Sequence, residues 1–283
     1  MARLLRDLDY SRIIQDDNLL QVIESNQQIK LDVEQSAQAE MISYLAQRYK
    51  TKEVFSNTSI FDISAIYYGK SLVEFTAATY APATTYAINS YVLYNGYIYK
   101  SNVGSVTGVW DTTKWNQICL NKTLYYITLP YSEFDPTVTY AVGNQIWYEN
   151  KTYTCVKACV GIYPTVAEFW GTGTAYTVTG IYPDNTTKWT LGDNRNQQIV
   201  LYLIDITLYH LHSRINPRNI PDLRKERYNG NDPMDRGGAI GWLKSVAHGN
   251  IQADLPVASP KQGLSMRSGN AGSYTNPSNN MMW

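Results

Sequence analysis

The sequence has few histidines and lacks three motifs that commonly mark catalytic sites. It lacks a Gly-x-Ser-x-Gly turn, a phosphate-binding loop and a His-Glu-x-x-His helix, and it contains only three histidines. His210 and His212 are two positions apart on an expected helix, so their side chains diverge and cannot share a metal ion. No two carboxylates stand out as an acid–base pair. We therefore expect no enzymatic activity, no catalytic site, no metal site and no cofactor.

Cysteine is also scarce. The three cysteines, Cys119, Cys155 and Cys159, make an odd number, which argues against a disulfide framework and leaves a single pair open. A Cys-x-x-x-Cys spacing with no histidine nearby is a poor pattern for zinc. We interpret Cys155 and Cys159 as two thiols packed on a strand.

Long apolar runs and excess charge are absent as well. No apolar run approaches the length of a membrane span, and residues 1–7 lack the apolar stretch of a secretory signal. Basic and acidic side chains balance at 24 each, which argues against a general binder of polyanions. We expect a soluble protein that is made in a cytoplasm and has no membrane partner.

What the sequence has in excess is tyrosine, with 24 tyrosines against five phenylalanines. Most of them lie between Tyr67 and Tyr182. Tyrosine favours strands and half-wet surfaces, because its ring packs while its hydroxyl remains solvated. The middle of the chain should therefore be rich in β-structure.

The two ends of the chain show helical patterns instead. An apolar stripe at spacings of three and four begins near Asp32, and a wider one runs from Gln197 to Asn216-Pro217. We expect residues 217–231 to form an irregular link. Asp232-Pro233 then supplies an N-cap for a last helix, which ends at Gly249.

An internal repeat organises the middle. Thr85–Ile88 matches Thr139–Val142, and Tyr94 and Tyr99 match Tyr148 and Tyr153 at the same offset. Each copy contains an expected hairpin and ends on Thr-Thr-Lys-Trp, at Trp115 in the first copy and Trp189 in the second. The second copy carries extra residues before that tetrapeptide. The repeat predicts two small β-modules in tandem.

The predicted fold class is α+β, with an all-α domain interrupted by the two β-modules. Its parts are a first helical segment, a first β-module with flanking strands, a second β-module, a second helical segment and an extended C-terminal tail. Their boundaries are residues 1–54, 55–130, 131–195, 196–250 and 251–283.

Each repeat resembles the chitinase-type carbohydrate-binding module, which has an early Tyr, a Tyr-x-Gly-x-x-Tyr hairpin and a closing Trp. The first copy has Tyr86, the hairpin Tyr94–Tyr99 and Trp115; the second has Tyr140, the hairpin Tyr148–Tyr153 without the glycine, and Trp189. Such modules bind glycans or serve as spacers and docking units. We assign the shared Trp115 and Trp189 to the module cores. The unshared tryptophans are the candidates for a glycan-facing surface: Trp110, Trp147 and Trp170.

The helical segments, joined end to end, resemble the head-completion adaptors of tailed bacteriophages. The resemblance rests on the order and spacing of Tyr44-Leu45, Arg48-Tyr49, Arg227-Tyr228, Trp242-Leu243 and Gly249. It implies a dodecameric ring in the virion neck, assembled in the bacterial cytoplasm, that joins the portal to tail or neck proteins and lines the channel for passing DNA. The family has a short loop where this chain has its insertion. We expect the modules to decorate the neck or hold fibres.

Basic residues gather between the last two helices: Arg214, Arg218, Arg224, Lys225 and Arg227. Two interpretations have equal weight. The cluster meets passing DNA or an acidic partner, or it is a solvated link paired locally with Asp222 and Glu226.

The tail is polar until its last residues, Met281, Met282 and Trp283. An apolar anchor on a long tether reaches a neighbouring groove at high effective concentration, and tryptophan is a favoured interface anchor. We predict that these residues dock on the portal. The rival function is a carbohydrate-binding accessory or adhesion protein of the virion, and a glycoside-acting enzyme is least favoured.

Overall fold

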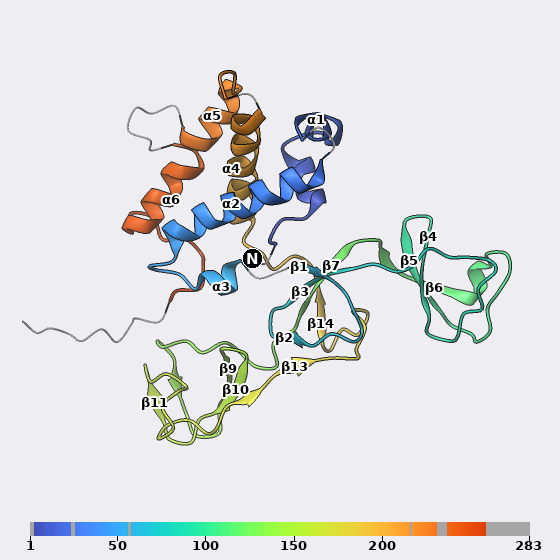
Figure 1. Cartoon of the computed structure of the whole chain (residues 1–283). Coiled ribbons are helices and arrows are strands. Elements are labelled where there is room, and N and C mark those ends of the chain that lie inside the picture. Colours follow the sequence, from blue (N-terminus) through green and yellow to red (C-terminus); the bar gives the residue numbers. More distant parts are fainter. Residues whose placement is uncertain (1–2, 24–25, 56–57, 216, 231–236, 259–283) are drawn as a thin grey trace, which may run out of the picture.

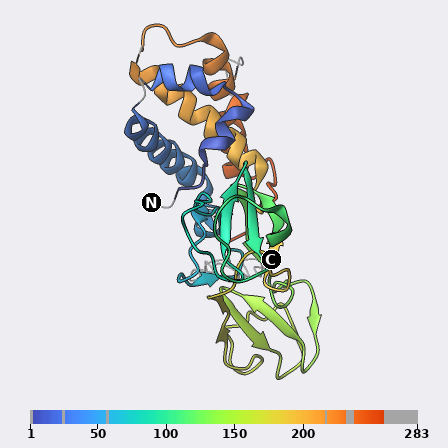
Figure 2. The same cartoon turned by 90° about the vertical axis from the view of Figure 1, so that its right-hand side faces the viewer.

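A computed structural model describes residues 3–23, 26–55, 58–215, 217–230 and 237–258. The chain combines helices and sheets, and the two kinds of structure are segregated (Figure 1). Figure 2 shows the helices at one end of the molecule and a compact group of strands at the other. A second group of strands faces the viewer.

The helical domain takes residues from both ends of the chain. Among the described residues it contains the 3-10 helix η1 and six α-helices: η1 (Asp7–Arg12), α1 (Asp16–Val22), α2 (Gln27–Leu45), α3 (Thr51–Val54), α4 (Gln197–Ile215), α5 (Asp222–Asn229) and α6 (Gly238–His248). Met41 of α2, Leu208 of α4 and Leu243 of α6 are fully buried in one continuous core. Helices α2, α4 and α6 therefore form the body of this domain.

Side-chain caps fix where two of these helices begin. The side chain of Asn26 accepts a hydrogen bond from the backbone N–H of Gln28, so α2 begins earlier than the predicted start at Asp32. Asn196 caps α4 in the same way, accepting from the N–H groups of Gln198 and Ile199. Helix α6 ends, as predicted, at Gly249, which has the left-handed conformation at φ 82°.

The prediction of an irregular link over residues 217–231 was wrong, because α5 lies within it. None of the residues of α5 is buried, so the segment lacks the apolar stripe that would mark a helix in the sequence. The predicted N-cap at Asp232-Pro233 lies outside the described residues.

A four-stranded sheet forms the centre of the β-region. Its order is β1 (Thr58–Ile60), β3 (Leu72–Phe75), β7 (Thr123–Ile127) and β14 (Trp189–Leu191), and only the β1–β3 pair is parallel. Beside it β2 (Tyr67–Tyr68) pairs with β13 (Thr177–Val178). These strands form a discontinuous central module, which takes residues 58–76, 123–128 and 177–192.

Two further modules are inserted into the central one. The first inserted module, residues 78–121, takes the place of the hairpin turn between β3 and β7 and contains β4 (Tyr91–Tyr94), β5 (Tyr97–Ser101), η2 (Thr112–Lys114) and β6 (Trp115–Leu120). The second inserted module, residues 132–175, lies between β7 and β13 and contains β8 (Thr139–Tyr140), β9 (Gln145–Tyr148), β10 (Lys151–Thr154), β11 (Cys159–Val160) and β12 (Thr174–Ala175).

All three modules share one plan. In each, the hydroxyl of an early tyrosine accepts a hydrogen bond from the backbone N–H five residues before it, at 2.7–2.8 Å. In each, a closing tryptophan pairs with the second strand of the hairpin. These pairs are Ile127 with Trp189, Ser101 with Trp115, and Cys155 with Trp170. The β-region is thus three copies of one module. The two predicted modules are present, but the prediction missed the central module and placed the end of the second copy at the wrong tryptophan.

The error lies in the end of the second copy. Trp170 closes the second inserted module, whereas Trp189 closes the central module. The shared Thr-Thr-Lys-Trp marks a local turn, in which Asp111 or Asn185 accepts hydrogen bonds from the threonine two residues later. That turn can lead into any closing strand, so it does not identify the hairpin that the strand joins.

The inserted modules are held against the central one by specific contacts. Tyr91 of the first inserted module stacks on Tyr182 at 4.2 Å between ring centroids, and Lys100 binds Asp184 at 2.7 Å. On the other side Lys70 binds Glu133 of the second inserted module at 2.6 Å.

We predict that Trp170 and Trp189, both in the predicted second copy, stabilise different modules. Trp170→Ala should raise amide hydrogen exchange within residues 132–175 alone. Trp189→Ala should raise exchange in residues 58–76 and 123–128, because these strands share its core. Each change creates a cavity that costs about 3–5 kcal/mol. Hydrogen-exchange mass spectrometry distinguishes them; identical exchange maps for the two variants would contradict the three-module arrangement.

Candidate functional site

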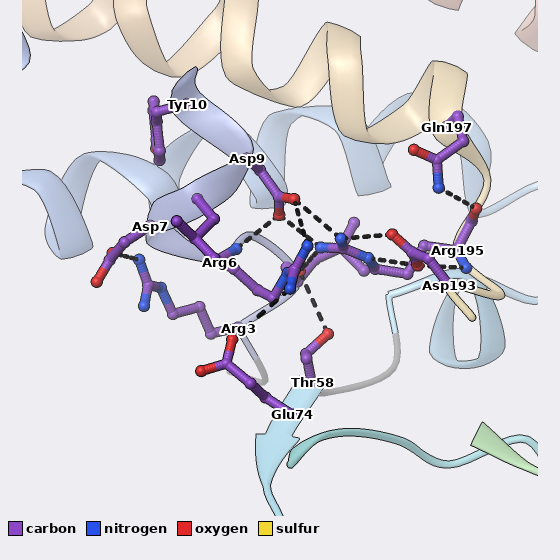
Figure 3. Close-up of polar contacts among 12 residues, drawn as sticks. Arg3, Arg6, Asp7, Asp9, Tyr10, Thr58, Glu74, Asp193, Arg195 and Gln197 are labelled. Carbon is purple, nitrogen blue, oxygen red and sulfur yellow. Dashed lines mark hydrogen bonds and ion pairs between the residues drawn. The ribbon is translucent and has the colours of Figure 1, made fainter. Parts of the chain in front are cut away.

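A buried ion-pair network joins the helical domain to the central module (Figure 3). Arg195 lies just before α4, and its side chain is 2% exposed. Its guanidinium binds both carboxylate oxygens of Asp9, at 2.6 and 3.0 Å, and both oxygens of Asp193, at 2.7 and 2.9 Å. It also donates to the carbonyl of Leu4 at 2.8 Å. All five N–H donors are used, which is the geometry in which arginine binds carboxylates most strongly.

Arg6 carries the network across to the sheet. Its backbone N–H donates to Asp9 at 2.8 Å, and its guanidinium lies 3.4 Å from Asp9 and 3.7 Å from Glu74 on β3. The first strand of the central module is tied to the same N-terminal segment, because the N–H of Thr58 donates to the carbonyl of Arg3 at 3.2 Å. The N-terminal segment therefore contacts both domains.

The charges in this network are mutually dependent. Burial by itself would raise the pKa of Asp9, but hydrogen bonds from Arg195 and the Arg6 amide outweigh it, so the pKa of Asp9 is lowered. The pKa of Asp193 is lowered by the same balance of burial against Arg195. Both carboxylates are thus held ionised, and removal of Arg195 would leave the buried charge of Asp9 without its main partner.

The predicted basic cluster is divided into separate environments. Arg227 binds Asp205 of α4 at 3.0 Å, and Lys225 binds Asp222 at 3.0 Å, whereas Arg214 and Arg218 are exposed. Arg224 is half-buried, and its Nη1 has no hydrogen-bond partner among the described residues. Burial and the neighbouring Arg227 lower the pKa of Arg224. The two arginines open to an external anion are Arg214 and Arg218.

Helix α5 is attached through polar and aromatic contacts. The hydroxyl of Tyr228 donates to Glu40 of α2 at 2.7 Å, and the other oxygen of Glu40 lies 2.7 Å from Nε2 of His210. Tyr209 stacks on Tyr228 with ring centroids 3.9 Å apart. These contacts explain why a helix without buried residues has a fixed position, and why its sequence gives no apolar signal.

The prediction that Trp147 and Trp170 face glycans was wrong, because they are 4% and 1% exposed. Trp170 closes its module and donates its indole N–H to the carbonyl of Ile162. Trp147 points away from the core that Ile146 and Tyr148 enter, because side chains alternate along a strand. It lies instead against Gly69 and Lys70 of the central module.

Trp110 is half-buried. Its ring stacks on Tyr94 at 3.9 Å and on Trp115 at 5.3 Å between centroids. The residue helps to form the small core of the first inserted module, which has too few aliphatic side chains to form one without aromatics. Only part of its ring is left open to a ligand.

A hollow of about 770 Å³ lies between the helical domain and the second inserted module. Its walls combine aromatic rings with charges of both signs: Phe134, Tyr148, Tyr163, Lys50, Glu53, Lys70, Glu133, Asp135 and Asp254. The ammonium of Lys50 lies 4.9 Å from the ring centroid of Tyr148. Rings beside hydrogen-bonding charges are what a polar ligand with an apolar face, such as a sugar, requires.

The root of the C-terminal tail belongs to the helical domain. Leu255 is buried in its core. The backbone N–H of Lys50 donates to the carbonyl of Pro256, and the N–H of Ala258 donates to the carbonyl of Arg48. The predicted tail from residue 251 therefore begins too early. Met281, Met282 and Trp283 lie outside the described residues.

Within the described ranges, no cluster of three or more His, Cys, Asp or Glu side chains could hold a metal ion. None of the helices described there is long and apolar enough to cross a membrane. No protein-family model matches the chain, and no curated protein matches it.

We predict that the junction depends on the Arg195–Asp9 pair. Arg195→Met should lower the free energy of unfolding in urea by about 3–5 kcal/mol, because it leaves a buried charge uncompensated. Asp9→Asn should also destabilise, and the double variant should lose less than the sum of the two, by about 1–3 kcal/mol. Lys225→Met, which breaks an exposed pair, should cost less than about 1 kcal/mol. Additive losses would contradict direct coupling.

The same pair sets a dependence on acid. Since the folded pKa of Asp9 is lowered, its contribution is complete above the unfolded pKa of about 3.9. It is lost as the pH falls through the lower folded value. Urea unfolding of the native chain should therefore weaken below about pH 4 more steeply than that of Asp9→Asn.

Proposed function

We propose that the chain is a structural protein of a bacteriophage neck, a head–tail adaptor that forms a ring under the portal. The observation that carries this proposal is that both ends of the chain share one helical core, while the whole β-region is inserted between α3 and α4. A domain built in this way can keep the contacts of a small helical adaptor and carry the modules as an addition.

The residues behind the resemblance to head-completion adaptors occupy structural positions in that core. Leu45 and Leu243 are fully buried, and Trp242 packs against Tyr202 at 5.0 Å between ring centroids. Tyr49 pairs with Val257 at the root of the tail, and Tyr228 docks α5. These roles support the proposal that the helical domain is the frame of the adaptor.

The arrangement of the two parts is compatible with a ring. Helix α5 and the C-terminal end of α4 lie at the end of the helical domain remote from the β-modules (Figure 1). The exposed Arg214 and Arg218 belong to this end. In the proposed ring it faces the DNA channel or an acidic neighbour, and the modules project outward.

The tail provides the test of the portal contact. Because Leu255 is a core residue, the truncation is placed after Ala258 rather than at residue 255. We expect the chain without residues 259–283 to keep its helical circular dichroism. Its affinity for the portal protein of the same virion should fall by about 30-fold or more, since a buried tryptophan anchor contributes about 2 kcal/mol or more.

Trp283→Ala in the full chain should cause most of the same loss, and Lys261→Ala, a change in the same segment, should have little effect. Portal binding by the truncated chain equal to that of the full chain would reject the docking role of the tail.

A second candidate function is carbohydrate binding by the virion, and the hollow beside the second inserted module favours it. Tyr163 offers a half-buried ring there, close to Glu133 and Asp135. If this function holds, Tyr163→Ala should abolish glycan-array binding with the fold intact, whereas the exposed Tyr97→Ala on the first inserted module should bind as the parent does. No glycan binding by the parent chain would reject this candidate and leave the adaptor proposal in place.

A further inference from the structure

Two free thiols lie together in the aromatic core of the second inserted module. Cys155 is 1% exposed and Cys159 is 8% exposed, and both pack with Trp170. Cys159 pairs with Tyr140 across the β8–β11 ladder, and the sulfur of Cys155 lies 3.8 Å from the carbonyl oxygen of Tyr140. Both thiols are thus brought to one residue of the facing strand, and they contact each other.

Each of the three modules has an equivalent pair of positions, one opposite the closing tryptophan and one opposite the early tyrosine. The residue that pairs with the closing tryptophan is Ile127 in the central module, Ser101 in the first inserted module and Cys155 in the second. The residue that pairs with the early tyrosine is Val178, Val106 or Cys159. All six are buried. Only the second inserted module has a thiol at both positions.

In the second inserted module, few backbone pairs hold the two segments that carry the cysteines. Its β8–β11 ladder has two residue pairs, and the closing tryptophan joins the hairpin through a single bridge. Small modules with limited cores are commonly stabilised by a disulfide. A covalent link between residues 155 and 159 would tie the hairpin to the strand that faces Tyr140.

We propose that Cys155 and Cys159 are a redox-responsive pair, which a small-molecule disulfide oxidises to an intramolecular disulfide. The thiolate of Cys159, the more exposed of the two, attacks the oxidant and releases one thiolate from it. Cys155 then loses its proton to solvent and attacks the Cys159 sulfur, which releases the second thiolate. The pair loses two electrons and two protons, and the small disulfide is reduced to two thiols.

The surroundings set the rate of this reaction. Burial raises the pKa of the Cys159 thiol, and the adjacent Cys155 raises it further. Since the thiolate is the nucleophile, closure is slow at neutral pH and its rate rises about tenfold per pH unit below that pKa. A reducing cytoplasm keeps the pair open, whereas an oxidising exterior closes it.

The test uses the full chain and oxidised glutathione. After incubation, acid quench and denaturation, maleimide should label one thiol, Cys119, where the untreated chain is labelled at all three cysteines. Trypsin cleaves after Lys157, between the two cysteines, so the closed form yields two peptides that separate only on reduction. Cys119→Ser, the matched control, should lose both remaining thiols at the same rate.

Three outcomes would overturn the proposal. They are full labelling of all three thiols after long incubation, a stable mixed disulfide with glutathione at Cys159 that never closes, and a link that includes Cys119. Each is read from the intact mass and the tryptic peptides of the unsubstituted chain. The test therefore does not depend on a core variant that might fail to fold, and its result is independent of the adaptor proposal.

Discussion

The contact between Arg195 and Asp9 is the interaction on which the arrangement of this chain depends. The β-region is an insertion, so its orientation depends on contacts that the helical domain and the N-terminal segment make near the points where the chain leaves and returns. Asp9 comes from the N-terminal segment, and Arg195 comes from the return point before α4. Their bidentate pair closes the junction inside the protein, where an unpaired charge is costly. Arg6 and Glu74 extend the same network to the central sheet.

Much of the fold could be predicted from the sequence, and the failures have physical causes. The apolar stripes of α2, α4 and α6 gave the helical domain, because burial imposes a period on the sequence. Helix α5 was missed because it is held by Tyr228 and Arg227 through polar contacts. The central module was missed because its parts are separated by two insertions. A local signal for it is Gly-Ile-Tyr-Pro, which precedes Trp170 and Trp189 alike.

The candidate sites were less predictable than the fold. Trp147 and Trp170 were assigned to the surface because they did not recur in both supposed copies, but Trp170 is the true counterpart of Trp115, and Trp147 contacts the neighbouring module. An error in aligning the repeat thus became an error in assigning function. Arg195 could not have been recognised, since one arginine beside Asp193 has no periodic signal and its partner Asp9 is remote in the sequence.

The central claim is that the helical domain forms a ring beneath a portal and that the three β-modules are carried outside it. The most direct measurement is the native mass of the chain, alone and bound to the portal of the same virion, together with negative-stain images. We expect a closed ring on the portal with protrusions at its rim. Its binding should add to the portal a mass close to twelve times the 32.1 kDa of one chain. A chain that stays monomeric in the presence of the portal would contradict it.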